Sequence, residues 1–227
     1  MKSDFKQKIK SAYYKDFFLR IKNEIEDSDD QPNSVLTKIY TDILYDNGTI
    51  SDYELLYFEK EISKNTNIKI SGYSFSEEDM RLDLFITHYN SENKIEKIES
   101  KKILNLIELA KNFYLQSTKK LYEKINSKED AFDISKSIFK NSKEISTVRI
   151  FVLTNCECDT TPKTTRENGI EFQNYLFDIT RIYSSSLGGP ESTNIKIDFS
   201  KFNQKVRCML AHKTTDKISS YMAFIPG

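Results

Sequence analysis

The chain has 227 residues, and its 34 Lys and Arg residues are balanced by 34 Asp and Glu residues. This balance excludes a global positive field that would draw the whole protein to nucleic acid or to an anionic membrane, so any basic surface is local. A hydrophobic fraction of 38% favours a globular core over disorder. The sequence has no apolar run long enough to span a membrane, no secretory signal pattern and only three Cys residues. We therefore expect a cytoplasmic protein without a disulfide framework or membrane association.

The first part of the chain predicts two helices. Apolar residues recur at mostly helical spacing over 5–26, among lysines and acids. Ser34 is the expected cap of a second helix that runs to about Leu44. The turn sequence Asp46-Asn47-Gly48 closes that helix.

Three strands are predicted next. Residues from Asp52 to Lys60 have strand character. Two further runs, 67–75 and 81–90, alternate apolar and polar residues on either side of an acidic turn. This pattern predicts a β-hairpin.

The second half of the chain alternates helices and strands. Long helical patterns cover about 95–125 and about 129–141, and the mostly apolar run Val148–Thr154 is typical of a buried strand flanked by helices. Beyond a polar loop we expect a strand at 170–173, a helix near 175–185 and strands at 194–199, 206–212 and 218–225.

This order of elements predicts an α/β fold. The sequence helix, three strands, helix, strand fits the αβββαβ core of restriction-endonuclease-like folds, with a mixed sheet. We expect N-terminal helices over 1–48, a nuclease-like core over 49–155 and a C-terminal α/β extension over 156–227. The extension is expected to pack on the core as part of a single compact unit.

The predicted hairpin carries the most informative residues. A metal-dependent nuclease needs carboxylates that converge on Mg²⁺ and usually a lysine, and side chains two apart on a strand share a face. The segments 68–73 and 81–90 resemble the N-terminal region of AIPR (abortive infection phage resistance) proteins, where the motif reads I-D-G and then L-F-Q-x-K-Y. In this chain Ser71 stands where the motif has Asp. Ile86 stands at the position of the Gln or Glu, and His88 stands at the position of the Lys.

The resemblance extends to later segments. VRIFVLTN at 148–155, FDITRIY at 177–183, IKIDF at 195–199 and SYMAFIPG at 220–227 resemble family motifs, with Phe177 in place of a Trp. The resemblance implies the N-terminal domain of a bacterial anti-phage defence protein, in which a nuclease-like fold without its catalytic motif and without a cofactor serves for recognition or as a scaffold. Because the chain ends on an apolar strand, we expect a C-terminal remainder or a partner chain to complete it.

A rearranged active site is one alternative. Asp83, together with the turn acids Glu77, Glu78 and Asp79, could hold Mg²⁺ and make the protein a metal-dependent nuclease. Strand alternation, however, places Asp83 on the face opposite to Ile86 and His88, and acidic turns are commonly only solvated. His88 could act as a base or bind phosphate, but a single histidine on a half-buried strand is more often structural.

A zinc-stapled interaction module is a second alternative. Its ligands would be Cys156, Cys158, Cys208 and His212, a set that zinc accepts. Structural zinc sites usually use C-x₂₋₄-C spacing, so we favour unrelated buried thiols.

A local basic patch is the remaining candidate for contact with nucleic acid. The predicted hairpin and the start of the long helix carry five lysines, with Glu96 and Glu99 interleaved. Such lysines contact phosphates or simply solvate a helix face. The partner is thus expected to be nucleic acid or a protein of a defence system, and the lysines are Lys69, Lys94, Lys97, Lys101 and Lys102.

Overall fold

A computed structural model of the chain describes residues 16–186, except 18, 22, 65, 77–79 and 93, and the backbone of two strands at 208–215 and 218–223. The chain divides into two compact units, Met1–Gly189 and Pro190–Gly227. Within the part of the chain that is described, no helix combines the length and the apolar character needed to cross a membrane.

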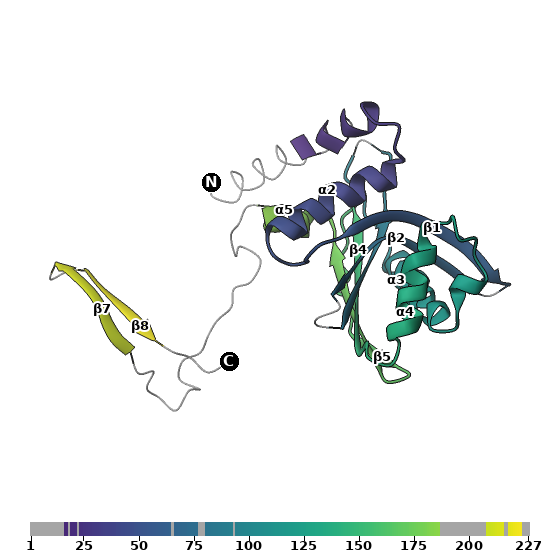
Figure 1. Ribbon diagram of the computed structural model, residues 1–227. Helices are drawn as coiled ribbons and strands as arrows, with labels where there is room; N and C mark the ends of the chain where they lie inside the picture. The colour runs from purple at the N-terminus through teal and green to yellow at the C-terminus, as the bar shows by residue number, and fades with distance from the viewer. Residues whose placement is uncertain are drawn as a thin grey trace. The chain divides into compact units, whose positions relative to one another are not determined.

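Six strands of the first unit form one mixed sheet in the order β1-β2-β3-β4-β6-β5 (Figure 1). β1, β2 and β3 pair antiparallel, β3, β4 and β6 pair parallel, and β5 pairs antiparallel with β6. β3 therefore joins an antiparallel half to a parallel half. The strands are β1 (Glu54–Ser63), β2 (Thr66–Ser76), β3 (Arg81–His88), β4 (Thr147–Thr154), β5 (Thr165–Glu167) and β6 (Ile170–Phe177).

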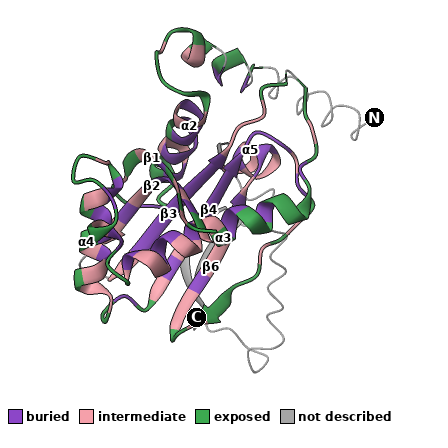
Figure 2. Ribbon diagram, turned by 90° about the vertical axis from the view of Figure 1, so that its right-hand side faces the viewer, coloured by how far each residue is buried: buried purple, intermediate pink, exposed green. Residues whose placement is uncertain are grey.

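Helices lie on both faces of this sheet. The described residues between 16 and 26 are helical, and the later helical elements are α2 (Pro32–Asp46), α3 (Ser100–Ser117), the 3₁₀ turn η1 (Leu121–Glu123), α4 (Ala131–Asn141) and α5 (Ile179–Ser186). Buried residues of α3 and α4 belong to one apolar cluster, and those of α2 and α5 belong to another. Figure 2 shows the central strands buried between these layers.

The two clusters follow from strand alternation on β3. Leu82, Leu84 and Ile86 are fully buried against the α3 and α4 side. Phe85 points to the α2 and α5 side, where its ring centroid lies 5.5 Å from that of Phe151. Because successive side chains of a strand point to opposite faces, one strand supplies both cores.

The predicted α/β fold and the predicted order of its elements through β4 are confirmed. The hairpin 67–75 with 81–90 is the antiparallel pair β2 and β3, and the buried strand at 148–154 is β4. The predicted helix at 129–141 is α4. The described part of the predicted helix at 5–26 is helical.

Several predicted boundaries were wrong. The long helix does not begin at 95, because Lys97 forms a bridge with Glu157 and the Ile98 amide donates to the Glu157 carbonyl at 3.0 Å. Ser34 does not cap α2, since the N-cap is Gln31 and Pro32 occupies the first turn, where a missing N–H costs little.

The region after β4 also differs from the prediction. β6 continues to Phe177, so α5 begins only at Ile179 instead of near 175. The three-residue edge strand β5 was not predicted, because its sequence Thr165–Glu167 has no apolar alternation.

The second unit contains an antiparallel strand pair, β7 (Cys208–Thr215) and β8 (Ile218–Ala223). These strands correspond to the predicted 206–212 and 218–225, whereas the predicted strand at 194–199 lies outside the described residues. That the last part of 156–227 packs on the core stays a prediction.

Gly72 allows β1 to approach β2 closely. A Cβ atom at this position would lie 2.7 Å from the Glu54 carbonyl oxygen and 3.3 Å from a ring carbon of Phe85. Neither the backbone oxygen nor the fully buried ring can move away freely. The glycine of the predicted hairpin therefore serves the packing of the sheet.

We expect Gly72→Ala to lower the free energy of unfolding by about 1–3 kcal/mol, because the methyl group overpacks the strand pair. Urea denaturation followed by circular dichroism measures the loss. Asn67→Ala, an exposed position in the same strand, is the matched control and should change stability by less than about 0.5 kcal/mol. Equal stability of the two variants would contradict the close approach.

Candidate functional site

Ser71 lies where the ladder between β2 and β3 ends. The paired residues run from Ser76 and Arg81 to Gly72 and Phe85. Beyond Gly72 the hydroxyl oxygen of Ser71 accepts a hydrogen bond from the Thr87 amide at 3.0 Å. Ser71 is 3% exposed, so this bond satisfies a donor that water cannot readily reach. At the position where the motif has an Asp, the side chain thus holds two strands together.

Ile86 and His88 lie further along β3 on the α3 side. Ile86 is fully buried in the apolar cluster and offers no polar atom. His88 is half-buried, and burial, followed by the positive charges of Lys102 and Lys69, lowers its pKa to about 4. At neutral pH the imidazole is uncharged, so His88 does not supply the positive charge of the motif's lysine.

Asp83 is engaged on the opposite face. It is 1% exposed, and its carboxylate accepts a hydrogen bond from Arg149 Nε at 2.7 Å and a second one from Arg149 Nη2. Burial opposes the charged form of Arg149, yet the hydrogen bonds and charge of Asp83 raise its pKa. The guanidinium also lies 5.1 Å from the centroid of the Phe151 ring. Such a bidentate pair fixes the carboxylate in place.

The residues at these positions do not fit Mg²⁺. The ion prefers carboxylate and water oxygens in octahedral geometry, whereas Ser71, Ile86 and His88 provide a bonded hydroxyl, an aliphatic chain and a neutral imidazole. Among the residues that are described, no three His, Cys, Asp or Glu side chains are grouped so that they could hold a metal. The turn acids at 77–79 lie outside the described residues.

A second set of polar contacts secures the carboxyl ends of β3 and β4. Asn155 accepts a hydrogen bond from the Asn90 amide and donates one to the Asn90 carbonyl, both at 2.8 Å. The Tyr40 hydroxyl donates to the Thr154 carbonyl at 2.8 Å. Asn155 was not singled out from the sequence, although its place after a buried strand, in the segment VRIFVLTN, was a usable signal.

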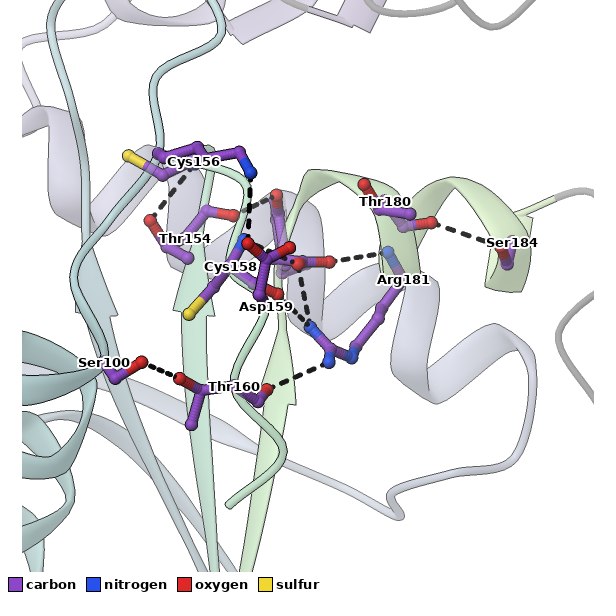
Figure 3. A network of polar contacts seen from close by, with 12 residues as sticks. Ser100, Thr154, Cys156, Cys158, Asp159, Thr160, Thr180, Arg181 and Ser184 are labelled. Carbon is purple, nitrogen blue, oxygen red and sulfur yellow. Dashed lines mark hydrogen bonds and ion pairs between the residues drawn. The ribbon is translucent and has the colours of Figure 1, made fainter.

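The FDITRIY segment forms a clamp on the loop that follows β4 (Figure 3). The Asp178 carboxylate accepts bonds from the amides of Arg181 and Cys158, at 2.8 and 3.0 Å, and from Arg181 Nη1 at 2.8 Å. The guanidinium of Arg181 also donates to the carbonyls of Cys158 and Thr160, at 3.3 and 3.0 Å. The guanidinium donors of Arg181 are thus bonded within the protein, so the FDITRIY segment holds the loop to α5.

The same loop is tied to the start of α3. Lys97 Nζ lies 3.0 Å from an Asp159 carboxylate oxygen, and the hydroxyls of Ser100 and Thr160 are hydrogen-bonded. The loop therefore joins helices from opposite faces of the sheet.

The described cysteines are buried in the cluster on the α3 side. Cys156 is 3% and Cys158 is 7% exposed, and burial raises the pKa of the Cys156 thiol. The side chains of Cys208 and His212, which complete the zinc set, lie outside the described residues. Apolar surroundings of this kind are typical of thiols that pack in a core.

Most lysines of the expected basic patch are paired with acids. Lys69 lies 3.0 Å from Glu59, and Lys94 lies 3.1 Å from Glu96. Lys97 is bonded to Asp159, as described above, while Lys101 and Lys102 are exposed at the start of α3. These pairs reduce the local positive field, although exposed pairs contribute little to stability.

The comparisons with known proteins agree with the sequence resemblance. The family model described as abortive infection phage resistance protein N-terminal domain matches residues 36–184. The chain belongs to this family. No curated protein and no solved structure matches it. The matched residues of this AIPR chain include all six strands of the sheet, so the motif positions, the buried ion pair and the loop clamp all belong to the family domain.

We expect the Asp83–Arg149 pair to be strongly coupled. Asp83→Asn leaves the guanidinium without its charge partner, and Arg149→Met leaves the buried carboxylate with only the longer contact of 3.7 Å to Arg81, so each variant should lose about 3 kcal/mol of stability. The double variant should lose much less than the sum, as measured by urea denaturation in a double-mutant cycle. Strictly additive losses would mean that the two side chains do not interact.

Proposed function

We propose that this chain is the N-terminal recognition or scaffold module of an abortive infection defence protein, built on a nuclease-like fold that has lost catalysis. The observation that carries the proposal is that none of the three motif positions offers a side chain suited to catalysis. Ser71 bonds the Thr87 amide, Ile86 is core, and His88 is neutral at physiological pH.

The arrangement of the sheet supports the nuclease-like part of the proposal. α2 is followed by the antiparallel strands β1, β2 and β3, then by helices and by the parallel strand β4. This is the order expected of a restriction-endonuclease-like core. A fold by itself supports a scaffold and not a reaction, so the function rests on the motif positions.

A nuclease that uses Asp83 is the weaker candidate. The carboxylate points away from Ile86 and His88 and neutralises Arg149, so metal binding would leave a half-buried guanidinium unpaired. The zinc-stapled module is likewise weaker, because Cys156 and Cys158 pack among apolar side chains. We therefore propose no metal or other cofactor for this domain.

The proposal includes a place of action and a partner. A cytoplasmic location agrees with the composition, and a protein of the same defence system is the partner that we favour. Nucleic acid is less favoured, since the lysines expected to contact phosphates are mostly paired with acids.

A cleavage assay tests the loss of catalysis. Purified protein is incubated with plasmid DNA, single-stranded DNA and RNA in Mg²⁺ or Mn²⁺, and we expect no cleavage above that of a protein-free control. The double variant Asp83→Asn/Arg149→Met, which should remain folded, is assayed in parallel. Metal-dependent cleavage by the unaltered chain that disappears in the double variant would establish the rearranged nuclease instead.

A further inference from the structure

A groove beside β1 leads to the first position of the lost motif. It has a volume of about 670 Å³ and is lined by the segment 24–31, the first turns of α2, three residues of β1, Ser71 and Asp130. Four separate parts of the chain thus form its walls. Its location places it over the position where the nuclease motif has its first carboxylate.

The groove has a strongly negative lining. Among the described residues, its lining includes five carboxylates and one lysine, Lys38, which itself lies 3.3 Å from Asp42. Glu24 is paired with Arg20 at 3.1 Å, and Asp29, Asp30 and Asp130 are exposed. A phosphodiester entering here would be repelled, whereas a cationic chain would be attracted. The five acids are Glu24, Asp27, Asp29, Asp30 and Asp130.

A second, independent feature is the strand edge that borders the groove. β1 is the outermost of the six described strands of the sheet, in which its one pairing partner is β2. Its register shifts between Leu55 and Phe58, and the three consecutive residues Leu55, Leu56 and Tyr57 line the groove. Among the described residues, no backbone hydrogen bond reaches the outer edge of β1. An unpaired edge of this kind is a template for an added strand.

The apolar side chains on this edge suit the same occupant. Leu55 is 41% exposed, and Val35 of α2 contributes a buried apolar wall on the opposite side. A chain that pairs with an edge strand directs alternate side chains to opposite sides, so one set can contact Leu55 while the other reaches the acids.

We propose that this groove binds an extended, lysine- or arginine-rich segment of a partner protein, which pairs with β1 and sets its cationic side chains against the groove acids. The inference rests on the proposed recognition function and names the chemistry of the partner. Its test measures binding and not cleavage, so its failure is distinguishable from the failure of the proposed function.

The test uses a fluorescein-labelled peptide of alternating Lys and Val, ten residues long to match β1. Fluorescence anisotropy with the full chain should show saturable binding that weakens as salt is added, because the attraction is electrostatic. An alternating Glu and Val peptide should not bind. A Lys and Val peptide N-methylated at alternate residues, which removes backbone donors, should bind at least about tenfold more weakly.

Matched charge reversals locate the site on the protein. Asp29→Lys with Asp130→Lys changes two walls of the groove and should weaken binding of the Lys and Val peptide by at least about tenfold. Glu92→Lys with Glu144→Lys makes the same charge change at exposed positions outside the groove lining and should leave binding within about twofold. Circular dichroism verifies that both variants are folded.

Three results would overturn the proposal. The first is equal loss of binding in the two double variants, which would reduce the effect to net charge. The second is undiminished binding of the N-methylated peptide, which would exclude strand pairing. The third is displacement of the Lys and Val peptide by a single-stranded oligonucleotide whose own affinity changes only in the groove variant, which would assign the groove to nucleic acid.

Discussion

The burial of β3 on both faces is the constraint on which the rest of the structure depends. β3 pairs antiparallel with β2 and parallel with β4, so it links the two halves of the sheet. Leu82, Leu84 and Ile86 fill the cluster under α3 and α4, and Phe85 fills the other cluster. A shift by one residue would exchange the two faces and move Asp83 into the apolar cluster under α3 and α4. The ion pair of Asp83 with Arg149 fits only the observed register.

This constraint explains why the residues at the motif positions can differ from those of a nuclease while the fold stays the same. In a nuclease, the end of β3 would carry two polar side chains toward a metal, at a cost in desolvation. Here Ile86 adds to the core, and Ser71 supplies an acceptor where the β2–β3 ladder ends. The domain thereby keeps the sheet and a groove beside it. The acidic lining of that groove is opposite in charge to what a nucleic acid requires, and for this reason we propose a protein partner.

Elements with strong periodicity could be predicted from the sequence. The alternation in 81–90 and the apolar run VRIFVLTN identified two central strands, because a buried strand face requires apolar residues at regular positions. The bridge at Lys97 could not be predicted, since its partner Glu157 is distant in sequence. β5 was missed for another reason, because its three residues have no apolar alternation although its partner β6 follows directly. The pairing of Asp83 with Arg149 joins residues 66 positions apart, so the sequence showed a strand acid but not its partner. The groove was missed as well, because four of its acids lie in one polar segment, 24–30, and only the fold brings Asp130 and β1 beside them.

Paramagnetic relaxation by Mn²⁺ tests the central claim most directly. The amide signals of Ser71, Ile86 and His88 in the nuclear magnetic resonance spectrum report on any ion bound at the motif positions, whether or not cleavage follows. We expect these three signals to keep their intensity while signals near exposed carboxylates elsewhere show only weak, nonspecific broadening. Selective, saturable loss of the three signals would show that a metal site persists on this strand pair and would contradict the account.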